Sequence, residues 1–285
     1  MQLTLADWCN NGDDIQIIFP SEITPTAFVN ASGSGNYNTS GSSVSGQTMN
    51  IVQSRSVSKI YNKASVYTVN VYRIRAPPST KTTNAITVKI MRNGFDKMVG
   101  TTTMKAVASA LTGAVAATLT TVNKVTTYRI NITTIDPLTS AGMIKITFPS
   151  TITPTLTSSC ATLSGTSVST NPTCAYDSTT NTITFTNLNS SSSNIPAQTF
   201  RFTILSVQNG PSIGTSGSFT AYTYYTNDIN DLVSQGNIAG ITATIDVLDA
   251  SKVSVVPSSY IVSDTIVTYT INFVTGNNIP QSGFV

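Results

Sequence analysis

Two copies of one stretch decide the fold: "IQIIFPSEITPT" at Ile15–Thr26 and "IKITFPSTITPT" at Ile144–Thr155. Each copy opens with a short β-branched run that has the character of a β-strand. A Phe-Pro-Ser segment then marks a turn before a second short run. The two copies lie 129 residues apart, since one starts at residue 15 and the other at residue 144. The chain therefore contains a long internal repeat.

Strand-like runs extend over the rest of the chain, and clusters of Gly, Pro, Asn, Asp and Ser separate them. No segment has a helical period with capping residues. Many short strands joined by polar turns are typical of antiparallel sandwiches. We predict an all-β chain with two Ig-like antiparallel β-sandwich domains in tandem. The runs cover residues 15–19, 66–74, 85–90, 125–133, 143–148, 181–188, 199–207, 218–225 and 266–274.

The end of the sequence repeats the opening of the middle copy. "VTYTINF" from Val267 parallels "TTYRINI" from Thr126, an offset of 141. We therefore expect residues 1–104 to form an incomplete sandwich that lacks its first strand, and residues 105–246 to form a complete one. Residues 247–285 are expected to be strands of a split, further domain.

A sandwich without an edge strand has room for a strand from elsewhere. Two arrangements supply it: residues 251–285 of a neighbouring subunit, in a head-to-tail homopolymer, or a covalently attached tandem domain. Both give a linear, beaded protein. The alternation in 266–274 forms one apolar face suited to insertion. The subunit-interface residues predicted from this reasoning are Trp8, Val267, Tyr269, Ile271, Phe273, Phe284 and Val285.

The segment "NKVTTYRINITTIDPLTSAGMIKITFPSTI" (123–152) combines a strand, a Pro-containing turn and the "IKITFPS" strand. It resembles repeats in large secreted surface and extracellular-fibre proteins of ciliates and other protists, which are tandem Ig-like sandwiches. The resemblance covers the whole chain and is closest at 122–155 and 266–285. It implies an extracellular or cell-surface location and a structural role in filaments, and it specifies no activity.

The composition excludes several classes of function. Charged residues make up 9% of the chain and the net charge is +3, which is too weak and dispersed to favour nucleic acid or an anionic membrane. There is no histidine, so His-dependent triads and His-ligated zinc are excluded. The uncharged stretch 106–123 is too weakly apolar for a membrane span. We expect no enzymatic activity and no cofactor.

Three cysteines and four sequons suggest an extracellular protein. Cys160 and Cys174 flank a Ser/Thr-rich loop and are expected to form a local disulfide, the alternative being two free buried thiols. Cys9 is the odd cysteine, either free or linked outside the chain. The N-x-S/T sequons begin at Asn30, Asn38, Asn131 and Asn189. N-linked glycans at these sites, and O-linked glycans on the Ser/Thr loops, are possible modifications.

Two readings of other features stay open. Asp228 and Asp231 in "TNDIND" are weak calcium candidates, and an Asx-rich turn is the more common role of such residues. No metal site is predicted. The alternative function is a cell-surface adhesin or glycan-binding module, whose partners would be surface glycans rather than further copies of this chain.

Overall fold

The computed structural model describes residues 2–4, 12–26, 31–33, 37–53, 66–156, 161–166, 168–169, 172–189, 194–248 and 250–275. The chain divides into two compact units. Unit 1 comprises Met1–Ala108 with Asn230–Leu232, and unit 2 comprises Ser109–Ile229 with Val233–Val285. The predicted boundary between residues 104 and 105 and the separate segment 247–285 stay predictions.

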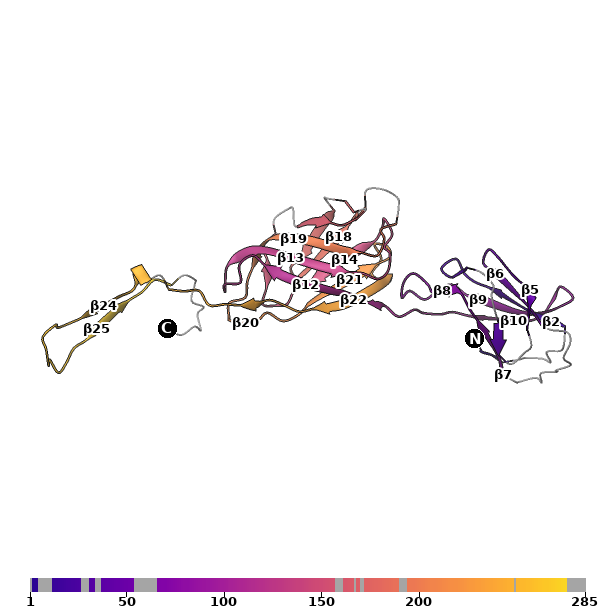
Figure 1. The fold of residues 1–285 in the computed structure, drawn as a ribbon, viewed down its shortest axis with the longest axis horizontal. Helices are drawn as coiled ribbons and strands as arrows, with labels where there is room; N and C mark the ends of the chain where they lie inside the picture. Colours follow the sequence, from indigo (N-terminus) through magenta and orange to yellow (C-terminus); the bar gives the residue numbers. More distant parts are fainter. Residues whose placement is uncertain are drawn as a thin grey trace. The chain divides into compact units, whose positions relative to one another are not determined.

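The all-β prediction is confirmed. Figure 1 shows strands in both units. Antiparallel ladders connect them, with one short parallel pair. Within the described ranges the helical content is a single 3-10 turn, η1 (Ala250–Lys252).

Unit 1 contains a five-stranded sheet, a three-stranded sheet and a short pair. The five-stranded order is β10-β9-β2-β6-β5, the three-stranded order is β1-β7-β4, and β3 pairs with β8. The bounds are β1 Gln2–Thr4, β2 Asp13–Ile18, β3 Thr24–Pro25, β4 Ala31–Gly33, β5 Tyr37–Ser45, β6 Thr48–Gln53, β7 Val66–Val71, β8 Ile74–Arg75, β9 Ile86–Arg92 and β10 Phe95–Thr102.

Unit 2 contains two larger sheets. One has the order β11-β22-β21-β14-β18-β17, and the other has the order β12-β13-β19-β15, with β16 also on β19. Two short pairs, β20–β23 and β24–β25, complete the unit. The bounds are β11 Ser109–Ala110, β12 Thr112–Ala117, β13 Val125–Thr133, β14 Met143–Thr147, β15 Thr153–Pro154, β16 Ala161–Ser164, β17 Thr173–Asp177, β18 Thr182–Thr186, β19 Thr199–Gln208, β20 Gly214–Thr215, β21 Phe219–Tyr224, β22 Leu232–Ile238, β23 Thr242–Ala243, β24 Ser254–Pro257 and β25 Tyr269–Asn272.

Alternation along the strands of unit 2 builds its core. In β13, every second side chain from Thr126 to Ile132 is buried, as the two-residue period requires. The two sheets meet through aromatic pairs: Phe185 and Phe202 lie 4.5 Å apart between ring centroids, and Tyr128 and Phe219 lie 6.1 Å apart. This packing of inner faces defines a β-sandwich.

The repeat found in the sequence is also a structural repeat. Thr24 pairs with Arg75 in unit 1 as Thr153 pairs with Gln208 in unit 2. Two residues before each of these partners the backbone is left-handed: φ is 59° at Arg73, before Arg75, and 55° at Ser206, before Gln208. Such values are uncommon outside glycine, so the shared position marks equivalent turns. In this segment each unit 2 residue therefore lies 133 residues after its unit 1 counterpart in the sequence, as Arg73 and Ser206 show.

Candidate functional site

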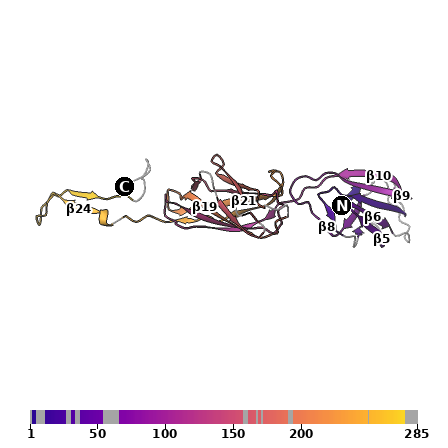
Figure 2. The same ribbon diagram turned by 90° about the horizontal axis from the view of Figure 1, so that it is seen from above.

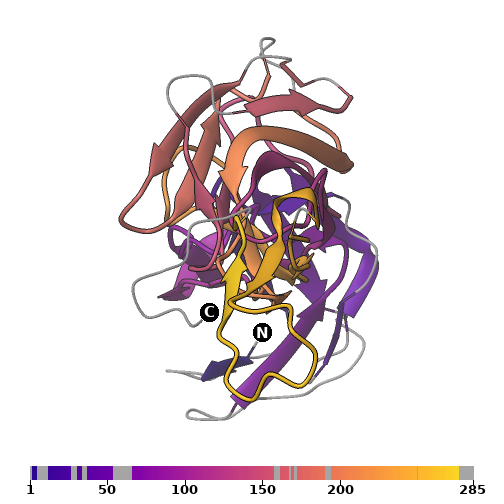
Figure 3. The same ribbon diagram turned by 90° about the vertical axis from the view of Figure 1, so that its left-hand side faces the viewer.

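The hairpin formed by β24 and β25 is the candidate functional site, and we call it the terminal hairpin (254–272; Figures 2 and 3). In its ladder Val255 pairs with Ile271 and Pro257 pairs with Tyr269. The β12–β13 hairpin of unit 2 has the same arrangement, with Val115 opposite Ile130 and Ala117 opposite Tyr128. The terminal hairpin is therefore a second copy of β12–β13.

The turns of the two hairpins match as well. A backbone N–H donates across the base of each turn, from Ser258 to Thr268 at 2.7 Å and from Thr118 to Thr127 at 2.9 Å. Each turn also holds one left-handed non-glycine residue, Ser263 with φ 68° and Asn123 with φ 56°. Up to this turn the two hairpins are offset by 140 residues (123 and 263). After the turn the offset is 141 (130 and 271), so each residue of the paired strands has a defined counterpart.

The two hairpins differ in what covers them. In unit 2, β13 pairs with β19 over eight residues, from Val125–Gln208 to Thr133–Thr199. As a result, Tyr128, Ile130 and Ile132 are each 0% exposed. Their counterparts in the terminal hairpin, Tyr269, Ile271 and Phe273, are 63%, 62% and 36% exposed. β24 and β25 form a two-stranded sheet by themselves, and such hairpins are marginal in water.

One buried asparagine fastens the β12–β13 hairpin in unit 2. The hydroxyl of Tyr128 donates to Asn209 Oδ1 at 2.7 Å. The amide of Asn209 donates in turn to the carbonyl oxygens of Leu119 and Thr121, at 2.9 and 2.7 Å. Burial raises the pKa of the Tyr128 phenol, so this hydroxyl is a permanent donor at ordinary pH. With the offset of 133 residues, Ala76 occupies the place of Asn209 in unit 1.

In the described part of unit 1, the place that such a hairpin fills in unit 2 holds one short strand, β1. β1 pairs with β7 over three residues, Gln2–Thr68 to Thr4–Val66. These pairs are the counterparts of the last three β13–β19 pairs, Asn131–Arg201 to Thr133–Thr199. Further along β7 and β8, Val71 and Ile74 are only partly buried, whereas their counterparts Ile204 and Val207 are 0% exposed.

The predicted interface residues fall into two groups. Tyr269, Ile271 and Phe273 lie on one side of β25 or just beyond it, and their exposed apolar side chains agree with the sequence pattern, although their role as an interface stays a prediction. Val267, just before β25, is partly buried. Trp8, Phe284 and Val285 lie outside the described residues.

The predicted modification sites are partly described. Asn131 is exposed on β13. Asn189 is half-buried after β18, Asn38 lies in β5, and Asn30 lies outside the described residues. Cys174 on β17 packs against the unit 2 core and is disulfide-bonded. Its partner is not among the described residues, which exclude both Cys160 and Cys9, so the Cys160–Cys174 pairing stays a prediction.

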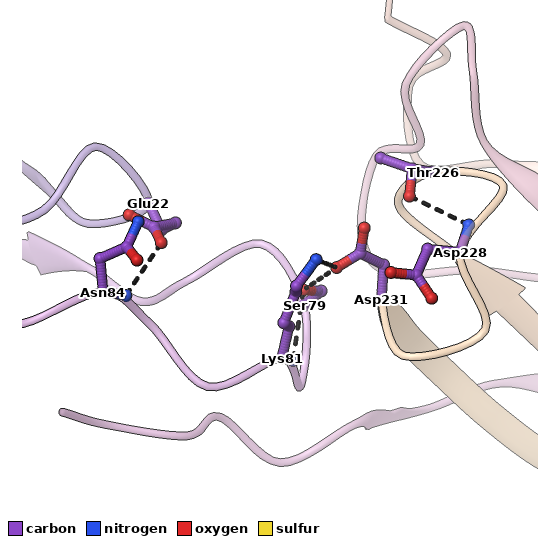
Figure 4. A network of polar contacts seen from close by, with 7 residues as sticks. All are labelled: Glu22, Ser79, Lys81, Asn84, Thr226, Asp228 and Asp231. Atoms are coloured by element: carbon purple, nitrogen blue, oxygen red, sulfur yellow. Dashed lines mark hydrogen bonds and ion pairs between the residues drawn. The ribbon is translucent and has the colours of Figure 1, made fainter.

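The "TNDIND" segment makes ordinary polar contacts (Figure 4). The Asp228 N–H donates to Thr226 Oγ1 at 3.1 Å, which is a turn contact. Asp231 is buried and accepts a hydrogen bond from Ser79 Oγ at 3.3 Å, and Lys81 Nζ lies 3.9 Å from the same oxygen. Among the described residues no three His, Cys, Asp or Glu side chains gather where they could hold a metal ion. The calcium candidate at Asp228 and Asp231 remains untested.

Half of the terminal hairpin, the strand β24, has no clear signal in the sequence. The sequence match with β13 begins only at Val267, and the counterpart of β24 is β12, an Ala/Gly/Thr segment without alternation. The signal that finds β24 is the offset of 140 carried back from the turn, which aligns Ser254 with Ala114.

Comparisons with known proteins give distant structural neighbours. No family model matches the chain, and no curated protein sequence matches it. In the described part of the chain no helix is both long enough and apolar enough to cross a membrane.

Three solved structures illustrate these neighbours. The bacterial hydrophobin BslA is 15% identical, covers 48% of this chain and 98% of its own, and has a TM-score of 0.30. The C-terminal domain of the antigen I/II-family protein AspA of Streptococcus pyogenes is 10% identical, and the match covers 80% of this chain and 85% of that domain, with a TM-score of 0.29. The full-length major pilin SpaD of Corynebacterium diphtheriae is 13% identical, and the match covers 80% of this chain and 58% of the pilin, with a TM-score of 0.30. At such scores these proteins assign no family or activity to the chain.

Proposed function

We propose that this protein is a structural subunit of an extracellular filament in which the terminal hairpin of one copy completes unit 1 of the next. The observation that carries this proposal is the match in register between the terminal hairpin and β12–β13, combined with opposite burial of Ile271 and Ile130. A segment that forms a sandwich core in one place and is exposed in another has a docking face of known shape.

Unit 1 of a second copy is the proposed acceptor. In unit 2, Ile130 lies opposite Phe202 on β19, and the counterpart of Phe202 on β7 is Val69. Docking in the same register places Ile271 beside Val69 and Tyr269 beside Val71. The partly buried Val71 and Ile74 then gain the cover that Ile204 and Val207 have in unit 2.

Burial of the hairpin face and strand pairing both contribute to the joint. Burying one large apolar side chain contributes on the order of 2 kcal/mol, so Tyr269 and Ile271 together contribute about 4 kcal/mol. Phe273 is not counted, because β1 already holds the corresponding place on β7. Association costs at least about 4 kcal/mol in lost translational and rotational freedom. The main-chain hydrogen bonds of strand addition supply further affinity. Because donor and acceptor are different surfaces, the contact is head-to-tail and does not close on itself by symmetry.

Two features support a place outside the cell. Cys174 is disulfide-bonded, and disulfides persist in oxidising compartments. The sequon asparagine Asn131 is exposed, where a glycan can be attached. The proposed role is structural rather than enzymatic and needs no cofactor. If several copies follow one another on a longer chain, the same pairing links covalent neighbours.

The test is the association state of the full chain, measured by light scattering after size exclusion and by negative-stain microscopy. We expect concentration-dependent linear oligomers that Ile271→Asp abolishes. Leu205→Asp is the matched control, since Leu205 is 54% exposed on β19 and lies outside the proposed joint. A chain that stays monomeric at high concentration, or oligomers indifferent to Ile271→Asp, would overturn the proposal.

Mixing two defective chains tests the direction of the joint. Ile271→Asp leaves the acceptor intact, and Val71→Asp on β7 leaves the hairpin intact. Together they should form one-to-one dimers and nothing longer, because each pair retains one working joint. A monomeric wild-type chain that binds a glycan array would instead favour the adhesin alternative.

A further inference from the structure

The terminal hairpin and β12–β13 share their backbone pairing but differ in the side chains around the turn. In unit 2 the turn rests on the segment after β23: Thr121 forms a bridge with Thr244, and the Thr120 and Thr244 hydroxyls lie 3.3 Å apart. The counterparts of Thr120 and Thr121 in the terminal hairpin are Tyr260 and Ile261, which are 79% and 75% exposed. A polar tip has been replaced by an apolar one.

The position that would receive this tip in unit 1 can be found from a pair of hydrogen bonds. The Thr83 N–H donates to the Met104 carbonyl oxygen, and the Met104 N–H donates to Thr83 Oγ1. In unit 2 the same reciprocal pair joins Ser216 and Ile241. Met104 is therefore the counterpart of Ile241. Three residues further along each chain, Val107 is the counterpart of Thr244.

Val107 matches the terminal hairpin in polarity. Its side chain is 93% exposed, and a valine so exposed gains stability when an apolar partner covers it. Thr244 suits the threonine tip of β12–β13, whereas Val107 suits the tyrosine and isoleucine tip of the terminal hairpin. The main-chain bridge between Thr121 and Thr244 has Ile261 and Val107 as its counterpart in the joint.

Charge adds a second difference. Lys124 at the β12–β13 turn pairs with Asp246 at 3.0 Å. Its counterpart in the terminal hairpin is Asp264, which would face Asp246 as a like charge if the hairpin replaced β12–β13 in a unit 2. Repulsion of this kind disfavours the wrong partner.

We infer that the terminal hairpin is selective for unit 1 of a second copy and rejected by unit 2, with the Ile261–Val107 contact as the specificity determinant. This inference rests on the proposed function, since it names the residues that choose the acceptor. Selectivity of this kind keeps each β12–β13 hairpin in its own sandwich while the subunits join end to end.

The test uses the full chain and three variants: Ile261→Asp, Val107→Lys and the double variant. Each single variant should weaken self-association about tenfold or more, because a charge is buried against an apolar partner. The double variant pairs the two charges across the joint and should recover most of the lost affinity, with a greater salt dependence than wild type. Ile213→Asp and Val247→Lys, which also substitute exposed residues, are the matched controls and should associate normally.

The outcomes separate the inference from the proposed function. Oligomers that Ile271→Asp abolishes but that Val107→Lys leaves unchanged would overturn the specificity determinant and retain the joint. Single variants that weaken association without rescue in the double variant would show that Ile261 and Val107 do not meet. A chain that never associates would overturn both.

Discussion

The contacts of Asn209 make the sharpest prediction of stability. This side chain is 2% exposed and joins the Tyr128 hydroxyl to two carbonyl oxygens of the β12–β13 hairpin. Asn209→Ala removes all three hydrogen bonds at once. It also leaves the fully buried Tyr128 hydroxyl without this acceptor. We expect the variant to loosen the hairpin and lower the free energy of unfolding of unit 2.

The magnitude follows from the geometry. The two bonds to carbonyl oxygens contribute about 1 kcal/mol each, and a buried hydroxyl left without a partner costs about 1–3 kcal/mol. Asn209→Ala should therefore destabilise unit 2 by about 3–5 kcal/mol, a large part of a typical total of about 5–15 kcal/mol. Tyr128→Phe removes only one of the three bonds and should cost about 1–2 kcal/mol.

The double variant tests the reasoning most directly. With both changes no orphaned hydroxyl remains, so the loss should be at least about 1 kcal/mol smaller than the sum of the single losses. Urea unfolding followed by hydrogen exchange in peptides of unit 2 measures each variant. Asn237→Ala, which removes an exposed acceptor from Thr220, is the control. A loss below about 1 kcal/mol for Asn209→Ala, or strict additivity, would refute the account.

Three further predictions concern titration and packing. Burial raises the pKa of the Tyr128 phenol above its ordinary 10.0. The stability that this group contributes to unit 2 should therefore be fully present below pH 10.0 and be lost as the pH rises further. Urea unfolding at several pH values measures this loss, which should be less steep in Tyr128→Phe. The Thr180 hydroxyl and the Thr179 N–H hold the pKa of Asp177 below 3.8, so the stability it contributes is present above that pH and is lost as the pH falls through the lowered pKa. Thr180→Val should raise this pKa toward its ordinary value, as an NMR titration of the carboxyl carbon would show, and an unchanged titration would contradict the assignment. Gly113→Val should destabilise unit 2 through a collision of its Cβ with the Asn131 carbonyl oxygen and with Ile238 Cδ1, and thermal unfolding unchanged from wild type would contradict that packing.

Sequence reasoning located the strands whose two faces differ. Residues 125–133 were predicted as a strand and are β13, because buried and exposed side chains alternate there. β5 and β12 were missed, since Ser, Gly and Ala carry little hydrophobic contrast and both strands are stabilised by the neighbours they pair with. Tertiary context, not local preference, makes such segments strands.

The candidate docking face was partly predictable for the same reason. The two-residue period groups Tyr269, Ile271 and Phe273 on one side, and their side chains are exposed, while their role as an interface stays a prediction. The sequence repeat alone could not show that Val107 is the counterpart of Thr244, because the intervening segments differ in length and share no residues. That correspondence required the hydrogen bonds of Thr83 and Ser216.

The alanine at position 76 has a mechanical consequence. Inside unit 2, Asn209 ties its hairpin to the sandwich through three hydrogen bonds. In the proposed joint the corresponding residue is Ala76, which has no polar atom on its side chain to hold the Tyr269 hydroxyl or the turn. Under tension, a filament of these subunits would therefore separate at the joints between subunits before unit 2 unfolds. Unit 1 would stay folded after such a separation and could bind a terminal hairpin again.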